Sequence, residues 1–490
     1  MPAVSYPRIA SFRTARAVVD HLEALGYSLP ADEQILGAPA SPLAQPLELP
    51  ALDEKTRSAA VGNRFAAQPM EGWDGEPDGR PSELTRRRWL RMATGGAKLI
   101  WGCEAVAVLP EARANPNQLV LNESTARGLA ALREEVAEAH RRRFGTADDL
   151  VIGLQLTHSG RFCRPNEKAK LEPVIAYHHP ILDAKYPAAA ECEPVSDCAV
   201  EGIVRAFAVA ARLAAEIGFD FVDLKHCHGY LAHEFLGAHH RPGPYGGSFE
   251  NRTRLLRELI AGVRASSPRL GIGVRLSVYD SVPFISDPAT GTGVPGRHHI
   301  PYTWGFGIDP QNPTEGDLSE AKCVLKLLRD QGVRLVNVTA GSPYYSAHLQ
   351  RPALFPPFDA YLPPEDPLAG AARLVLAARD LKAEFPEMVI VSTGWSYFQD
   401  YLPQFAQAAL RAGWADFVGL GRVMLSYPEL PADVLEGRPL DRKRLCRTFS
   451  DCTNGPRTGL ISGCYPLDPF YKDRPEAEEL ESFKKEWVKR

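Results

Sequence analysis

From residue 63 onward, apolar runs of strand length alternate with longer segments in which apolar residues recur at helical spacing. Short apolar runs bounded by turns are typical of buried parallel strands, and the longer segments are typical of amphipathic helices. Eight runs predict strands: 64–68, 98–101, 150–156, 219–224, 271–276, 334–338, 388–392 and 415–420. The segments between them predict helices that include 126–142, 198–216, 251–265, 319–330, 370–384, 401–412 and 428–435. Eight such units are the number that a (β/α)8 TIM barrel requires, so we predict this α/β fold.

The two ends of the chain depart from this alternation. Residues 1–62 predict a short N-terminal lead-in with an amphipathic helix at 14–25, and the barrel is expected to occupy 63–440. Residues 441–490 predict a C-terminal extension that ends in a charged helix at 476–490. A doubly wound open sheet is the alternative fold. The G-x-G-x-x-G match at 291–296 does not favour it, because this match lies in a proline-rich loop rather than between a strand and a helix.

Two connections, 280–316 and 341–367, are too long to be turns, and both are rich in aromatic residues. Long loops in compact domains are usually functional or disordered, and aromatic residues argue against disorder. Both loops leave the carboxyl ends of predicted strands. We therefore expect them to cover a substrate pocket, with additional surface packing as the alternative.

Composition narrows the class of partner. The formal net charge is −4, with 56 basic and 60 acidic residues, so no basic field indicates nucleic acid. No run of 18 apolar residues and no secretory leader is found, which predicts a cytoplasmic protein without a membrane partner. Nine cysteines, an odd number, indicate free thiols in a reducing compartment. We expect a small-molecule substrate, and a homo-oligomer is left open.

Residues that can take part in catalysis or ligand binding lie at the ends of the predicted strands. A barrel brings these strand ends together around one pit. The fourth strand is followed by Lys225, His228 and Tyr230. Glycines after the last two strands would let backbone N–H groups approach a phosphate, and an arginine there would grip its oxygens. The other candidates at strand ends are Pro69, Met70, Glu71, Gly102, Cys103, Gln155, Arg275, Gly394, Trp395, Gly421 and Arg422.

Three short motifs follow the fourth strand: HGYL at 228–231, EFL at 234–236, and YGGS with ENR at 245–252. Together with the strand ends they resemble the Old Yellow Enzyme family of FMN-dependent NADH:flavin oxidoreductases. The resemblance runs from about residue 63 to 428 and implies an FMN-binding barrel that NADH or NADPH reduces. It also implies hydride transfer from the reduced flavin to an activated carbon–carbon double bond.

The resemblance assigns roles to the candidate residues. It implies that Gly394, Trp395, Gly421 and Arg422 bind the FMN phosphate. Arg275 and Gln155 correspond to the residues beside the pyrimidine end of the flavin. Gly102, or Cys103 beside it, corresponds to a small residue whose backbone approaches the ring, and 69–71 is the segment after the first strand. His228, together with Lys225, would hold the substrate oxygen, and Tyr230 would supply a proton.

Two positions depart from the family pattern. Lys225 stands where the family commonly has the first histidine of the oxygen-binding pair, and Glu71 stands where a threonine or cysteine is frequent. A free lysine ammonium would favour anionic ligands. Alternatively, Glu71 or Asp223 neutralises Lys225, which then serves internal packing. Glu71 would disfavour an anionic reduced flavin, or else pair with Lys225 or another cation.

Larger relatives carry a four-iron cluster directly after the barrel, held by four cysteines. Here Cys446, Cys452 and Cys464 are present, and Phe449 stands where another ligand would be expected. Because such a cluster normally needs four thiolates, we expect no metal. An unconventional metal site is the alternative.

These observations favour an FMN-dependent ene-reductase. A flavin dehydrogenase or demethylase for an anionic or amine substrate is the second hypothesis, motivated by Lys225 and Glu71. A flavin-binding barrel protein without turnover is the third.

Overall fold

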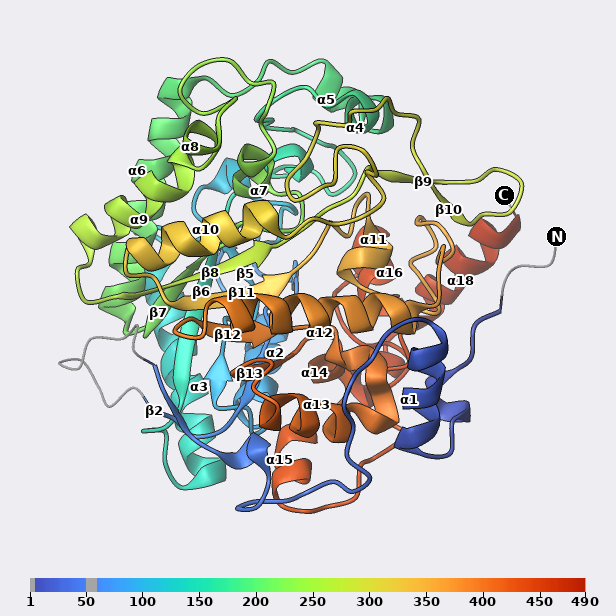
Figure 1. Cartoon of the computed structure of the whole chain (residues 1–490). Helices are drawn as coiled ribbons and strands as arrows, with labels where there is room; N and C mark the ends of the chain where they lie inside the picture. The colour runs from blue at the N-terminus through green and yellow to red at the C-terminus, as the bar shows by residue number, and fades with distance from the viewer. Residues whose placement is uncertain (1–4, 50–59, 490) are drawn as a thin grey trace.

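The computed structural model describes residues 5–49 and 60–489, and its centre is a closed parallel barrel (Figure 1). Pairing runs in the order β4-β3-β13-β12-β11-β8-β7-β6, and the pairing of β4 with β6 closes the ring. The strands are β3 (Phe65–Ala67), β4 (Leu99–Ile100), β6 (Val151–Thr157), β7 (Phe221–Leu224), β8 (Gly271–Ser277), β11 (Leu335–Thr339), β12 (Val389–Ser392) and β13 (Phe417–Leu420). The predicted (β/α)8 barrel and all eight predicted strand positions are therefore confirmed.

One further strand of the barrel sheet was not predicted. β5 (Ala105–Ala107) pairs in parallel with the second half of β6, so that Ala105 lies opposite Gln155. β4 pairs with the first half of β6, at Val151 and Ile152. The second strand position is thus divided between two short strands. This division explains why an apolar run of only four residues was recognised there.

The barrel is surrounded by the predicted helices. They are α3 (Ala126–Phe144), α6 (Asp197–Ile217), α9 (Arg254–Ser266), α10 (Ser319–Asp330), α12 (Pro367–Glu384), α13 (Leu402–Arg411) and α15 (Leu430–Leu435). The lead-in contains α1 (Ala15–Ala24), as expected, and the hairpin of β1 (Leu47–Glu48) with β2 (Ala60–Val61). The part of the predicted lead-in at residues 1–4 and 50–59 lies outside the described residues.

Two predicted helices are divided, and one helix of more than ten residues was missed. The predicted helix 251–265 is preceded by a separate turn, α8 (Phe249–Arg252), and the predicted helix 401–412 follows the 3-10 segment η5 (Trp395–Tyr401). α2 (Glu83–Ala93) was not predicted, because its polar sequence hides its periodicity although Trp89 and Met92 are buried. The remaining short elements are η1 (Ile9–Ser11), η2 (Pro42–Ala44), η3 (Pro110–Ala112), η4 (Gly160–Phe162), α4 (Pro180–Lys185), α5 (Pro187–Ala190), α7 (Leu231–Leu236) and α14 (Val423–Ser426).

The amino end of the barrel is filled by large apolar side chains. Trp101 and Phe221 stack edge to face at 5.1 Å between ring centroids, and both are fully buried. Glycines on neighbouring strands make room for them, since a Cβ at Gly153 would lie 2.2 Å from the Phe221 ring. Leu99, Leu335, Phe417 and other residues complete this cluster. Because apolar side chains fill the amino end of the barrel, a polar ligand site is expected at the carboxyl end.

Both long loops leave the carboxyl ends of their strands, but residues of the loop 341–367 line the main cavity, whereas the described residues of 280–316 do not. The loop 280–316 contains the hairpin of β9 (Phe284–Ser286) and β10 (Gly293–Pro295), which includes the G-x-G-x-x-G match. The loop 341–367 contains α11 (Ala347–Gln350). Asp280 joins the two loops, since it accepts hydrogen bonds from the hydroxyls of Tyr345 and Ser346 at 2.7 and 2.8 Å.

The C-terminal extension packs against the loop 341–367. It contains α16 (Asp451–Arg457), α17 (Pro469–Lys472) and α18 (Pro475–Lys489), and Figure 1 shows α16 next to α11. The predicted tail helix is therefore confirmed as far as residue 489. The extension and the loop are joined by hydrogen bonds that involve Thr448, Ser450, Thr453, Asn454 and Arg457. Among the described residues, no helix combines the length and the apolarity needed to cross a bilayer.

Candidate active site

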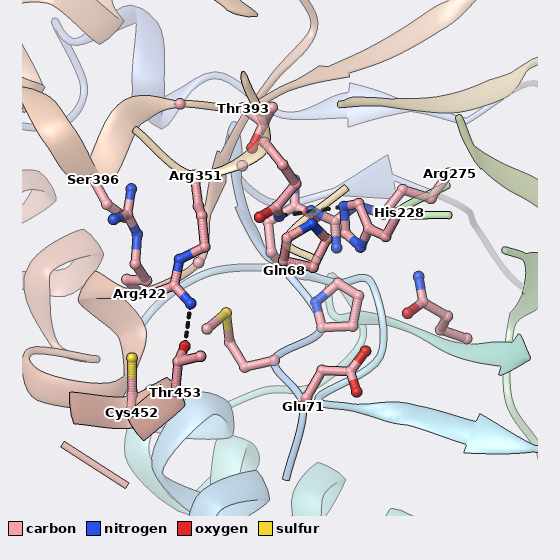
Figure 2. Close-up of a pocket in the computed structure, with 18 of the residues that line it drawn as sticks. Gln68, Glu71, His228, Arg275, Arg351, Thr393, Ser396, Arg422, Cys452 and Thr453 are labelled. Carbon is pink, nitrogen blue, oxygen red and sulfur yellow. Dashed lines mark hydrogen bonds between the residues drawn. The ribbon is translucent and has the colours of Figure 1, made fainter. Parts of the chain in front are cut away.

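A cavity of about 1090 Å³, its mouth included, lies at the carboxyl ends of the barrel strands. The walls come from the strand ends, the loop 341–367 and α16. Figure 2 shows Arg351 and Arg422 near one another on one side, and His228 and Arg275 on the other. We call these two sides the arginine end and the barrel-centre end.

Most of the residues predicted from the sequence line this cavity. They are Pro69, Met70, Glu71, Gln155, Lys225, His228, Tyr230, Arg275, Gly394, Trp395, Gly421 and Arg422. The expectation that the strand ends converge on one pit is thus met by the geometry. The roles that the resemblance gives to these side chains remain predictions.

Gly102 and Cys103 are the exceptions, because neither residue lines the cavity. Cys103 is fully buried in the apolar core, and its carbonyl accepts a hydrogen bond from Met70 N at 3.0 Å. Gly102 has a φ of 104°, and a Cβ there would lie 2.9 Å from Gln155 N. Both residues therefore support cavity-lining residues from behind.

The arginine end carries positive charge without a carboxylate partner. Arg422 Nη2 donates to the carbonyl of Pro352 at 2.9 Å, whereas its Nη1 is buried without a partner. Gly394, with a φ of 96°, forms the turn between β12 and η5, in a conformation that favours glycine. The buried Trp395 indole donates to Ser392 Oγ at 2.9 Å.

The barrel-centre end is organised by Asp223, which is fully buried on β7. Its carboxylate accepts hydrogen bonds from Gln155 Nε2 at 2.5 Å, Trp101 Nε1 at 2.7 Å and the backbone N–H of Arg275 at 2.6 Å. Arg275 Nε is buried without a partner. Burial lowers the pKa of Arg275. The side chain is placed to meet a ligand group that carries negative charge.

Glu71 accepts hydrogen bonds from Lys225 and Tyr230. We call the part of the cavity wall formed by these three residues the substrate side. Lys225 Nζ lies 2.9 Å from Glu71 Oε1, and the Tyr230 hydroxyl donates to the same carboxylate at 3.0 Å. Tyr344 lies 3.1 Å from the Tyr230 hydroxyl, and since a phenol has one proton, Tyr344 is the donor in this contact. The Lys225 ammonium also lies 3.9 Å from the centroid of the Tyr230 ring. Of the partners considered for Lys225, Glu71 is the one that it contacts.

The remaining oxygen-binding candidate, His228, is a neutral donor or acceptor. Burial, together with the charges of Arg275 and Lys225, holds the pKa of His228 well below its usual range. The imidazole Nε2 contacts Gln350 at 3.3 Å and Thr339 at 3.4 Å. Burial and the nearby Glu71 hold the pKa of Tyr230 well above its usual range, so its proton is retained near neutral pH.

Several residues in the cavity wall were not singled out from the sequence. Trp73, Tyr344, Arg351, Thr453 and Arg457 all line it. Trp73 and Tyr344 belong to stretches already noticed, the end of the first strand and the aromatic loop. Arg351 lies far along that loop, and Thr453 and Arg457 lie in the extension, where no local pattern marks them.

Cys446, Cys452 and Cys464 are all free thiols. Cys446 and Cys464 are buried, whereas Cys452 is partly exposed and lines the cavity. Burial raises the pKa of both buried thiols. Within residues 5–49 and 60–489, no group of three or more potential ligands is arranged to hold a metal ion.

The donor set of the cavity fits an elongated ligand with a phosphate at one end and a polar ring at the other. Arg422 has an unpartnered guanidinium nitrogen at the arginine end, and Arg275 has one at the barrel-centre end. Fold and cavity thus define a (β/α)8 barrel with a ligand cavity at the carboxyl ends of its strands.

Comparison with known proteins names the family. The sequence profile of the NADH:flavin oxidoreductase / NADH oxidase family matches residues 55–289. The resemblance seen in the motifs is thereby confirmed. An NADPH dehydrogenase of Bacillus subtilis (strain 168) is 35% identical over 214 residues, covering 42% of this chain and 57% of the relative. An NADPH dehydrogenase of Bacillus velezensis is 34% identical over 215 residues, with the same coverage. The chain thus spans little more than half the length of these relatives.

Solved structures support the fold. An Old Yellow Enzyme homologue from Zymomonas mobilis matches with a TM-score of 0.55 and 21% identity, covering 81% of this chain and 93% of the other. A 2-naphthoyl-CoA reductase complex matches with a TM-score of 0.61 and 20% identity, covering 90% of this chain and 58% of the other.

Proposed function

We propose that the protein is an FMN-dependent oxidoreductase that uses NADH or NADPH to reduce a small molecule with a carbon–carbon double bond conjugated to a carbonyl group. The observation that carries this proposal is the division of the cavity. Cations without carboxylate partners lie where a phosphate and a flavin pyrimidine would be held, and a charge-neutral set of donors lies on the substrate side. The family match of residues 55–289 supports the cofactor.

In this proposal, Gly394, Gly421 and Arg422 hold the phosphate, and Gln155 and Arg275 hold the pyrimidine end. The bound flavin supplies hydride transfer. A positive charge at Arg275 favours negative charge on the ring edge beside it.

The substrate is held by neutral recognition. Lys225 carries three N–H donors, of which one faces Glu71, and the others can donate to a carbonyl oxygen. Because Glu71 neutralises the ammonium, the pair favours a carbonyl over a carboxylate. His228 is a second donor candidate, so both side chains would stabilise negative charge that develops on the oxygen.

Tyr230 is placed to hold the proton for the α-carbon. Its hydroxyl lies between Glu71 and Tyr344, so Tyr344 can return a proton to Tyr230 Oη after transfer. The ammonium of Lys225 over the Tyr230 ring would stabilise the phenolate formed in that step.

A second candidate is a dehydrogenase or demethylase for an amine. The Glu71 side chain is 32% exposed and lies next to aromatic residues of the cavity, which favours a cationic ligand. Lys225 already supplies a cation to this carboxylate, however, so an amine would have to share Glu71 with it.

The deciding experiment uses purified protein incubated with FMN. We expect a flavin absorbance band that NADH or NADPH bleaches anaerobically, and that a conjugated enone restores. Absence of the band would contradict the central proposal. Bleaching by an amine in place of a nicotinamide would support the second candidate. A stable flavin band that neither reductant bleaches would indicate a flavin-binding protein without turnover.

A further inference from the structure

Arg351 lies at the arginine end beside Arg422 and was given no role by the family motifs. It belongs to the loop 341–367, directly after α11, and lines the same cavity as Arg422. The two residues are connected, because Arg422 Nη2 donates to the carbonyl of Pro352, the neighbour of Arg351. Figure 2 shows the two guanidinium groups next to one another.

The guanidinium of Arg351 is anchored at one nitrogen and unpartnered at the others. Its Nη1 donates to Thr453 Oγ of α16, whereas Nε and Nη2 are buried without a hydrogen-bond partner. In the described part of the chain, neither Arg351 nor Arg422 forms an ion pair with a carboxylate. Burial, and the charges of Arg422 and Arg457 against the opposing effect of Cys452, lower the pKa of Arg351.

Two other buried arginines of this protein are compensated by carboxylates. Arg88 is paired with Asp74 and Glu104, and Arg161 with Asp183 and Glu234. A buried arginine without an anion is costly, and two such arginines side by side repel each other. The arginine end is therefore a site that a ligand with about two negative charges would complete. A phosphate monoester has this charge near neutral pH.

We propose that Arg351 is a second phosphate-binding arginine, which forms a clamp with Arg422 and is held in place by Thr453 of the C-terminal extension. This inference rests on the proposed function and deepens it. The ligand is the phosphate monoester of FMN. The extension thus becomes part of the cofactor site, although it lies beyond the barrel.

The test compares FMN with riboflavin, which lacks only the phosphate. Flavin-free protein is titrated with each compound, and flavin fluorescence gives the two dissociation constants. Arg351→Met should lower the preference for FMN over riboflavin about ten- to hundredfold, while riboflavin affinity stays within about twofold. Thr453→Val, which removes the hydroxyl and keeps the shape, should lower the preference about three- to tenfold.

Arg447→Met is the matched control, since Arg447 lies in the extension but pairs with Asp400 outside the cavity lining. Its preference for FMN should equal that of the wild type. Equal weakening of FMN and riboflavin by Arg351→Met would show a structural role and overturn the clamp. Wild-type preference in a folded Arg351→Met protein would also overturn it.

A further experiment distinguishes the two possible sources of the phosphate monoester, which are FMN and a phosphorylated substrate. Inorganic phosphate should raise the melting temperature of the flavin-free wild type and not that of the FMN-loaded protein, because FMN fills the clamp. Phosphate that stabilises the loaded protein through Arg351 would assign the clamp to a phosphorylated substrate and overturn the cofactor assignment. If the wild type binds neither flavin, the proposed function itself fails, which is a different result from either of these.

Discussion

The arginine end and the substrate side of the cavity differ in whether their cations are paired with carboxylates. At the arginine end, Arg351 and Arg422 have buried N–H groups without partners. On the substrate side, Lys225 is 1% exposed but is paired with Glu71, which also accepts from Tyr230. Both sides contain buried cations, and only one of them contains the matching anion.

We expect this difference in charge pairing to distinguish the site of a permanently bound ligand from the site of ligands that exchange. Unpaired cations lower the stability of the ligand-free protein. A tightly bound anion offsets this loss, as expected for a resident cofactor that occupies the site permanently. A side that is already neutral can exchange substrates and products without leaving charge exposed. The comparison therefore predicts opposite effects of substitutions at the two sides on the stability of the flavin-free protein.

The largest effect is expected for Arg422→Ala. Loss of the charge-assisted contact should weaken FMN binding by about 1.5–3 kcal/mol, roughly ten- to hundredfold. The flavin-free variant should be no less stable than the wild type, because an uncompensated buried charge has been removed. Flavin fluorescence titration and thermal unfolding measure the two quantities. Wild-type flavin occupancy in the variant would show that the phosphate lies elsewhere.

Glu71→Gln should act in the opposite direction on stability. It leaves the Lys225 ammonium buried without its counter-ion, which should lower the free energy of unfolding of the flavin-free protein by about 1–2 kcal/mol. The partial exposure of Glu71 keeps the effect below that of a fully buried pair. Urea unfolding measures it, and the double variant with Lys225→Met should recover most of the loss. A single variant as stable as the wild type would remove the distinction between the two sides.

Asp280 is an intermediate case, a buried carboxylate with hydrogen bonds but without a cation. Burial raises the pKa of Asp280 to about 6. The folded state thus binds this proton more tightly than the unfolded state, so the stability contributed by protonation is fully present below the ordinary Asp pKa of about 3.9 and is lost as the pH rises through 6. Relative to Asp280→Asn, the wild type should lose about 1 kcal/mol between pH 5 and pH 7. Parallel pH profiles of the two proteins would contradict the raised pKa.

The smallest effect is expected for Lys225→Met on anion binding. Since Glu71 neutralises the ammonium, affinity for phenolates and for an unsaturated carboxylate should change by less than about threefold, as followed by perturbation of the flavin spectrum. A loss of tenfold or more, with flavin content intact, would mean that Lys225 acts as a free cation after all.

The sequence predicted the barrel well because strand runs such as 150–156 and 271–276 are buried along their whole length and are therefore mainly apolar, with one polar residue in each, Gln155 and Arg275. The prediction from sequence failed where the buried residues do not form an apolar pattern along the chain. α2 has a polar sequence with three consecutive arginines, and one of them, Arg88, is buried because Asp74 and Glu104 compensate it. β5 is too short to be recognised.

For the site, the residues at strand ends could be predicted because the barrel itself places them. The position of Gly102 and Cys103 behind the cavity could not, since it depends on how β4 gives way to β5. Nor could the pairing of Lys225 with Glu71 be decided, as these residues are separated by 154 positions. Arg351 and Thr453 were beyond sequence reasoning, because their contact joins a loop to an extension without a motif.

The contacts of the extension also bear on the order of events during synthesis. Thr453 meets Arg351 across 102 residues, and the Ser462 hydroxyl donates to the carbonyl of Glu71 across 391 residues. A chain emerging from the ribosome can form its barrel strands in order, but these two contacts must wait for the last part of the chain. The cavity wall is therefore completed only after translation has passed residue 462, and stable flavin loading is expected to be a late, post-translational step of maturation.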